Sequence, residues 1–322
     1  MPSIDYRTRY VDFVRELTTR FDRVQAMRSA SGGQYELVGA LMRETLIAAG
    51  LRPHHSLVDV GCGSGRLAFA LRSYLEGPYL GIDVVPELLA YAREACNRQD
   101  WRFEETSGTG IPAPDGTADM VCFFSLLTHL LHEDSYHYLA EAARVLKDEG
   151  TIVFSFLDFA VDGHWFVFEG MLDARATREI THHNQFMARG MIQPWAARLG
   201  LSVAAILDGD RPQVRLATDV ITEDGGVMPR DTGLGQSICI LRKGSMAAGT
   251  SEPEDGAVRS SIIASADAPV VDEVARRQLR LLEGRVVRAE DDLSRLAKDV
   301  RAILATRSWR AIRRLKSWLG GG

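Results

Sequence analysis

The stretch VDVGCGSGR, residues 58–66, places three glycines within five positions directly after a short apolar run. The apolar run predicts a buried strand, and the glycines predict a turn whose backbone can lie against a ligand because no Cβ atoms intervene. Residues 66–75 follow with the apolar spacing of a helix. A strand, a glycine turn and a helix in this order bring backbone N–H groups to one point, which predicts a ligand-binding site there.

Strand and helix patterns continue to alternate along the chain. Strand-like runs are expected at residues 56–60, 79–84, 101–105, 118–125, 150–157, 201–207 and 235–242. Helical periodicity separates most of the first five, so these strands are expected to be parallel, whereas a loop alone joins the last two. The sequence therefore predicts an α/β fold, a doubly wound seven-stranded Rossmann-like sheet with an antiparallel edge hairpin. Residues 158–184 are expected to be irregular.

Composition and periodicity divide the chain into four parts. Residues 1–244 hold N-terminal helices and the predicted sheet, and residues 245–269, rich in Ser, Ala, Gly and acids, predict a flexible linker. Residues 270–305 carry a heptad seam that predicts a coiled coil. The seam consists of Leu279, Leu282, Val286, Ala289, Leu293, Leu296, Val300 and Ile303. Residues 306–322 form a basic amphipathic tail, typical of a helix that binds an anionic membrane surface or a protein partner.

Composition also narrows the class of protein. The 322 residues are 46% hydrophobic, enough for a folded core, and the net charge of -5 argues against a protein that mainly coats nucleic acid. The N-terminus is charged, and no apolar run approaches the roughly 18 residues that indicate a membrane span. The expected location is therefore the cytoplasm, with the tail as a contact to the inner membrane face. The four cysteines include no C-x-x-C pair, which predicts buried thiols.

The spacing of the glycines separates two classes of cofactor. A dinucleotide site favours G-x-G-x-x-G, whereas Gly61, Gly63 and Gly65 give G-x-G-x-G, with Asp59 two positions earlier. The segment DVGCGSG resembles the first motif of class I S-adenosylmethionine-dependent methyltransferases. This resemblance implies that S-adenosyl-L-methionine is the cofactor and that its methionyl part and ribose lie on the three glycines. It also implies that Asp59 lies near the methionyl amine.

Later segments resemble further motifs of the same family. In LGIDVVP the resemblance implies that Asp83 accepts bonds from both ribose hydroxyls and that Val84 lies against the adenine; an N-cap for the next helix is the alternative role of Asp83. SGTGIP departs from the family pattern, because Ser107 stands where an aspartate would meet the adenine. We expect Ser107 and Gly108 to contact the adenine nevertheless. Phe124 ends the fourth strand and is expected to border the cofactor.

Methyl transfer requires alignment of the acceptor, the methyl group and the sulfur, and a base where the acceptor is a hydroxyl. His129 follows the fourth strand, whose end borders the methyl group in the family, and His183 lies in the variable region that commonly shapes the acceptor pocket. Either is a candidate general base, and packing at the end of the sheet is the alternative role for His129. No metal is expected, because Asp158 alone cannot form an acidic metal site.

The acceptor is indicated mainly by the tail. A coiled coil followed by SWRAIRRLKSW resembles the tails of bacterial surface-polysaccharide assembly enzymes, through Ser308, Trp309 and Arg310. This resemblance implies O-methylation of a sugar or glycan intermediate by a homo-oligomer assembled through the coiled coil. The alternatives are a methyltransferase of a soluble small metabolite and a non-catalytic adaptor that keeps the fold. No nucleic-acid partner is expected.

Overall fold

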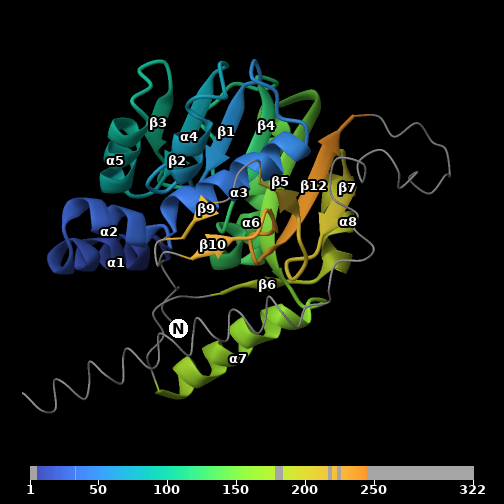
Figure 1. Cartoon of the computed structure of the whole chain (residues 1–322). Coiled ribbons are helices and arrows are strands. Elements are labelled where there is room, and N and C mark those ends of the chain that lie inside the picture. The colour runs from blue at the N-terminus through green and yellow to red at the C-terminus, as the bar shows by residue number, and fades with distance from the viewer. Residues whose placement is uncertain (1–5, 33, 178–183, 217–219, 223–225, 245–322) are drawn as a thin grey trace, which may run out of the picture. The chain divides into compact units, whose positions relative to one another are not determined.

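A mixed β-sheet forms the centre of the computed structural model, with the strand order β3-β2-β1-β4-β5-β12-β7 (Figure 1). The strands are β1 Leu57–Val60, β2 Tyr79–Asp83, β3 Arg102–Glu105, β4 Ala118–Phe123, β5 Leu146–Asp158, β7 Leu201–Leu207 and β12 Ser237–Lys243. β1 pairs in parallel with both β2 and β4, so the strand order changes direction at β1. β12 is antiparallel to β5 and β7. The predicted Rossmann-like sheet and its edge hairpin are therefore confirmed.

The structure describes five segments of the chain, which are residues 6–32, 34–177, 184–216, 220–222 and 226–244. The predicted linker, coiled coil and basic tail, residues 245–322, lie outside these segments, and so does His183. Within the segments described, no helix combines the length and the apolar character that a membrane crossing requires.

Helices cover both faces of the sheet (Figure 1). They are α3 (Tyr35–Ala48), α4 (Arg66–Leu71) and α5 (Pro86–Cys96) on one face, and α6 (His132–Val145) and α8 (Arg189–Arg198) on the other. The alternation of side chains along each strand supplies both layers: Leu57 of β1 packs with α3 and α4, whereas Val58 and Val60 pack with α6. The carboxyl ends of β1 and β4 then lie at the switch point where open α/β sheets bind ligands.

The N-terminal region, where the sequence predicts helices, contains two of them before α3. α1 spans Tyr6–Arg20 and α2 spans Arg23–Ala30. Asp22 starts the second helix, because its Oδ1 accepts a hydrogen bond from the backbone N–H of Gln25 at 3.0 Å. Both helices pack against the start of α5, which brings them to the end of β2.

The segment expected to be irregular, residues 158–184, contains the helix α7, Asp162–Thr177. The prediction is wrong here because the apolar residues of α7 do not form one buried stripe: Phe166 is 66% exposed and Leu172 is 54% exposed. Two glycines inside the helix lower its propensity further. Nothing in the spacing of the side chains therefore marked the helix.

The loops around the sheet contain several short strands. β6, Phe186–Met187, extends the sheet in parallel with the end of β5. In the long loop before β12, β8 (Val214–Arg215) pairs with β11 (Asp231–Thr232), and β9 (Val220–Ile221) pairs with β10 (Val227–Met228). The first of these two ladders packs beside α3, so the loop is attached to the layer that contains the N-terminal helices.

Candidate functional site

A cavity of about 590 Å³ opens at the carboxyl ends of β1 and β4. It is bounded by the first three residues of the glycine loop (residues 61–65), the end of β2, the segment after β4, and residues of α1 and α3. This position coincides with the switch point of the sheet, where the connections that follow β1 and β4 lead to opposite faces. The cavity is therefore where the sequence places its expected ligand.

Two of the three glycines present bare backbone to this cavity. Gly61 and Gly63 line it with φ angles of +75° and +54°. A Cβ atom on Gly61 would lie 3.2 Å from the side chain of Leu126, and one on Gly63 would lie 2.9 Å from Oγ of Ser31. The loop therefore has no room for side chains at these positions, and a ligand can approach its backbone.

Gly65, the last glycine of the loop, packs against α5. It is absent from the cavity lining, and a Cβ atom there would lie 2.6 Å from Cβ of Ala92. Its φ of +78° lets the chain enter α4 while α4 packs closely against α5. Close packing of α4 on α5 therefore favours a glycine at this position, and a contact of Gly65 with the cofactor stays a prediction.

Asp83 joins the end of β2 to the glycine loop. Its Oδ2 accepts a hydrogen bond from the backbone N–H of Gly63 at 2.9 Å, and its Oδ1 accepts one from Val85 at 3.0 Å. Burial raises the pKa of Asp83 to about 6, against the backbone hydrogen bonds of Gly63, Val85 and Val84, which lower it. Each oxygen keeps a further lone pair, so the carboxylate can still accept hydrogen bonds from a ligand.

Asp59 is the second buried acid of the cavity wall. Its Oδ2 accepts a hydrogen bond from the Tyr79 hydroxyl at 2.6 Å, and its Oδ1 accepts a weak one from the Cys122 thiol at 3.6 Å. Burial raises the pKa of Asp59 to about 6, although both hydrogen bonds lower it. A cationic group in the cavity would therefore meet carboxylates that ionise just below neutral pH.

The other expected cofactor contacts divide into two groups. Val84 and Phe124 line the cavity. Ser107 and Gly108 are exposed and are not part of the lining. Tyr138 links Gly108 to the cavity wall, since it lines the cavity and its hydroxyl donates a hydrogen bond to the carbonyl of Gly108 at 3.0 Å. Contacts from Ser107 and Gly108 to an adenine stay a prediction.

Of the two candidate bases, His129 and His183, the described part of the structure includes only His129. His129 ends a short 3-10 helix, Leu127–His129, and lines the cavity near the end of β4. His183 lies outside the described residues. Asp158 is fully buried away from the lining and pairs with Arg189, with 2.5 Å between Oδ2 and Nε. Among the described side chains, His129 is thus the imidazole that the fold brings to the cavity.

Several lining residues were missed by the sequence analysis. Arg66, directly after the last glycine, is one of them. Ser125 has a φ of +56°, rare for a residue with a side chain, and its hydroxyl donates to Oε1 of Gln236 at 3.3 Å. Its backbone N–H donates to Oγ of Ser155 at 2.7 Å. Gln236 lies 111 positions from Ser125, so no local pattern could have joined them.

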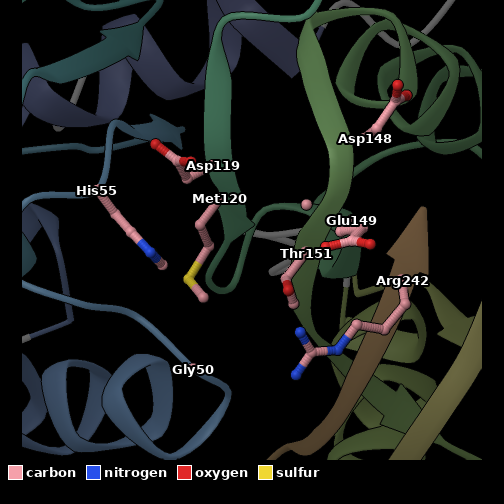
Figure 2. Close-up of a pocket in the computed structure, with 9 residues that line it drawn as sticks. Gly50, His55, Asp119, Met120, Asp148, Glu149, Thr151 and Arg242 are labelled. Carbon is pink, nitrogen blue, oxygen red and sulfur yellow. The ribbon is translucent and has the colours of Figure 1, made fainter. Parts of the chain in front are cut away.

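A second cavity, of about 220 Å³, lies at the opposite ends of the strands. Figure 2 shows His55 and Arg242 reaching toward Met120 and Thr151 from opposite sides. Two of its charged residues already have partners: Lys147 and Ser56 bond to Asp119, and Arg242 donates to the carbonyl of Ala49 at 3.1 Å. Burial raises the pKa of Asp119, but these bonds outweigh it and hold the value at about 2. The larger cavity is therefore the candidate site.

Residues 58–154, which include much of the cavity wall, are similar to known methyltransferases. A family model described as "Methyltransferase domain" matches residues 58–154, which contain the glycine loop, Asp83 and His129. The chain is 38% identical over 71 residues to the ribosomal protein L11 methyltransferase of Burkholderia cenocepacia. That alignment covers 22% of this chain and 23% of the relative, so the chain spans about a quarter of this curated protein.

Solved structures with a similar arrangement cover more of the chain at lower identity. The methyltransferase in a complex with the Trm112 activator of Haloferax volcanii is 18% identical, with a TM-score of 0.49, and the match covers 75% of this chain and 98% of that one. Magnesium protoporphyrin IX methyltransferase of Synechocystis, solved with bound S-adenosylhomocysteine, is 16% identical with a TM-score of 0.48, covering 74% and 100%. Residues 58–154 therefore match the methyltransferase domain family, in agreement with the glycine motif.

Proposed function

We propose that the whole chain acts as an S-adenosyl-L-methionine-dependent methyltransferase. The observation that carries this proposal is the pairing of the buried Asp83 with the glycine loop at Gly63. A carboxylate with free lone pairs suits two neighbouring ribose hydroxyls, and bare backbone suits a ligand that lies along it. The proposal is tested by calorimetric titration of the full chain with S-adenosylhomocysteine, which carries no transferable methyl group. An absence of binding by the folded protein would reject it.

The residues of the cavity fit the cofactor part by part. When bound, the cofactor supplies a methyl group activated by a sulfonium. Asp83 would accept hydrogen bonds from the ribose, and Asp59 would face the methionyl amine. Val84 and Phe124 would provide apolar contacts to the rest of the molecule. Removal of water by this buried wall would strengthen the polar contacts that remain.

His129 is proposed as the general base. Where the acceptor is a hydroxyl, a neutral imidazole nitrogen can take its proton as the new bond to carbon forms. The position of His129 in the cavity wall after β4 supports this role. His183 is the second candidate, and Ser107 and Gly108 are proposed as contacts at the adenine end. No metal ion is part of the proposal.

The proposed acceptor is a sugar or glycan intermediate of bacterial surface-polysaccharide assembly, methylated on oxygen. The support is the segment of Ser308, Trp309 and Arg310 after a heptad pattern, together with a base in the cavity wall that suits a hydroxyl acceptor. A soluble small metabolite is the alternative acceptor, and a non-catalytic adaptor is the alternative function. Loss of cofactor binding would favour the adaptor, whereas binding without transfer to sugars would favour the metabolite.

The proposed domain organisation assigns separate tasks to the parts of the chain. Residues 1–244 would hold the catalytic domain and residues 245–269 a linker. Residues 270–305 would form a coiled coil that makes the chain a homo-oligomer, and a parallel dimer is favoured by Val and Leu in the seam. Residues 306–322 would place a cytoplasmic enzyme at the inner membrane face.

The basic tail gives the first testable prediction. Each Lys or Arg near an anionic bilayer contributes about 1 kcal/mol, so Arg313→Gln is expected to weaken binding to vesicles that contain phosphatidylglycerol about fivefold. The matched control is Arg259→Gln in the proposed linker, which should leave vesicle binding unchanged. Sedimentation with vesicles measures both. Equal binding to neutral phosphatidylcholine vesicles would argue against an electrostatic contact and favour a protein partner.

The buried acids predict how cofactor binding depends on pH. In the ligand-free protein the pKa values of Asp59 and Asp83 are about 6, because burial disfavours their charged forms. A ligand with a cationic amine prefers ionised carboxylates, so affinity should hold near pH 7 and fall as the pH drops through 6. At about pH 5 only about one tenth of each carboxylate is ionised, so each carboxylate that the ligand requires in its charged form lowers the affinity about tenfold. Titrations of S-adenosylhomocysteine at both pH values measure this fall.

Asp59→Asn provides the comparison for the pH experiment. The variant binds more weakly at neutral pH, but one titrating group is gone, so its affinity should change less between pH 7 and pH 5 than that of the native chain. An affinity that is equal at both pH values in the native chain would contradict the prediction.

A further inference from the structure

Arg66 is a cation in the wall of the cavity, and none of the described residues forms a salt bridge with it. It is the first residue of α4, and it lines the cavity directly after the glycine loop. Its Nη1 donates a hydrogen bond to the backbone carbonyl of Ser31 at 2.5 Å. In the described segments, no carboxylate oxygen lies within 4.0 Å of its guanidinium.

Two other partly buried arginines of the domain, Arg144 and Arg189, are neutralised by acids, whereas Arg242 donates to the carbonyl of Ala49. Arg144 pairs with Glu141 at 2.8 Å and with Asp115 at 2.6 Å. Arg189 pairs with Asp158 and Asp208, each at 2.5 Å. Arg66 differs from both, because its guanidinium donates to a neutral carbonyl and meets no acid among the described residues.

A buried cation without a counter-charge costs free energy, because it loses contact with water. Burial lowers the pKa of Arg66 to about 10, which leaves the side chain charged at neutral pH. A charge removed from water is normally kept in a protein only when a counter-charge compensates it. Since the described part of the chain supplies no such partner at contact distance, an anionic ligand is the natural source of the compensation.

The guanidinium is also held in a fixed place relative to the glycine loop. Ser31, whose carbonyl accepts from Arg66, places its Oγ 2.7 Å from Oγ of Ser64 and 3.2 Å from the backbone nitrogen of Ser64. The Tyr35 hydroxyl donates to the carbonyl of Ser64 at 2.8 Å. The connection between α2 and α3 is therefore fastened to the loop, and Arg66 is positioned through it.

We propose that Arg66 binds the carboxylate of the ligand's amino-acid end and so selects ligands that carry this group. The inference rests on the proposed function. Asp59 lies in the same cavity wall and suits the neighbouring amine, so the two side chains offer opposite charges to the two ends of a zwitterion. Arg66 is thus a specificity residue for the cofactor, separate from Asp83 at the ribose.

The test compares two ligands that differ at the amino-acid end. S-adenosylhomocysteine and 5′-methylthioadenosine share the adenine, the ribose and the thioether, but only the first has a carboxylate. In calorimetric titrations of the full chain, Arg66→Met should weaken S-adenosylhomocysteine binding roughly 10- to 100-fold. Binding of 5′-methylthioadenosine should change less than about twofold. Arg66→Lys should recover part of the lost affinity, because it restores the charge without the planar fork.

Arg72→Met is the matched control, since it makes the same substitution at the exposed end of α4, away from the cavity lining. It should leave both affinities unchanged. Equal losses for the two ligands in Arg66→Met would overturn the inference and show that Arg66 only holds Ser31 in place. Unchanged binding of both ligands would also overturn it.

The outcomes separate this inference from the proposed function. If the folded native chain binds neither ligand, both ideas fail together. If the native chain binds both ligands and Arg66→Met does not change their ratio, only the role of Arg66 fails. Should Arg66→Met not fold, Arg66→Lys carries the comparison, because a selective loss for S-adenosylhomocysteine is still expected and an equal loss still overturns the inference.

Discussion

Asp83→Ala is expected to reduce the affinity for S-adenosylhomocysteine at least about 100-fold. The substitution removes the proposed charged acceptor for two ribose hydroxyls, and each bond to a charged group contributes about 1.5–3 kcal/mol. It also removes the acceptor of the Gly63 N–H, so the loop loses the bond that holds it against β2. Both effects act in the same direction. Calorimetry on the full chain measures the loss.

Glu87→Ala is the matched control for this experiment. Glu87 is an exposed acid in the first turn of α5, four positions after Asp83, and it does not line the cavity. Its removal should leave the affinity unchanged. Thermal unfolding of both variants shows whether Asp83→Ala is still folded at the titration temperature. A folded Asp83→Ala that binds like the native chain would reject the ribose role and leave Asp83 with its bonds to the start of α5.

Much of the sheet could be predicted because its signals are local. The core strands are runs of apolar residues, as in Met120, Val121 and Cys122 of β4, and such runs identify strands that are covered on both faces. The loop alone between the last two strands was enough to predict their antiparallel pairing. α7 could not be found in this way, because side chains such as Phe166 point to solvent from a helix without one apolar face.

The site was predictable only as far as its residues share a motif. Asp59, Gly61 and Gly63 are close in sequence, and each lies at the cavity. Ser125 and Gln236 meet through a hydrogen bond across the sheet, and their contact depends on β12 lying beside β5. That neighbourhood follows from the topology of the whole domain, so no short stretch of sequence contains it.

Gly65→Ala is expected to destabilise the domain by about 3 kcal/mol. A Cβ atom at this position would lie 2.6 Å from Cβ and 3.0 Å from Cα of Ala92, so α4 and α5 would have to move apart. Overpacking of this kind costs roughly 1–3 kcal/mol, and a side chain at positive φ costs about 1 kcal/mol more. Denaturant unfolding followed by circular dichroism measures the change. The affinity for S-adenosylhomocysteine should fall much less than in Asp83→Ala, because Gly65 does not line the cavity.

Gly200→Ala separates the two contributions. Gly200 has a similar φ of +69°, but a Cβ atom there would meet nothing within 4 Å. Its substitution should therefore destabilise the domain only by the strain of a side chain at positive φ, about 1 kcal/mol. Adding Ala92→Gly to Gly65→Ala should recover about 1 kcal/mol in a double-mutant cycle, since it removes the nearer of the two overlapping atoms. If Gly65→Ala is no less stable than Gly200→Ala, close packing of α4 on α5 is not the reason for a glycine at the end of the loop.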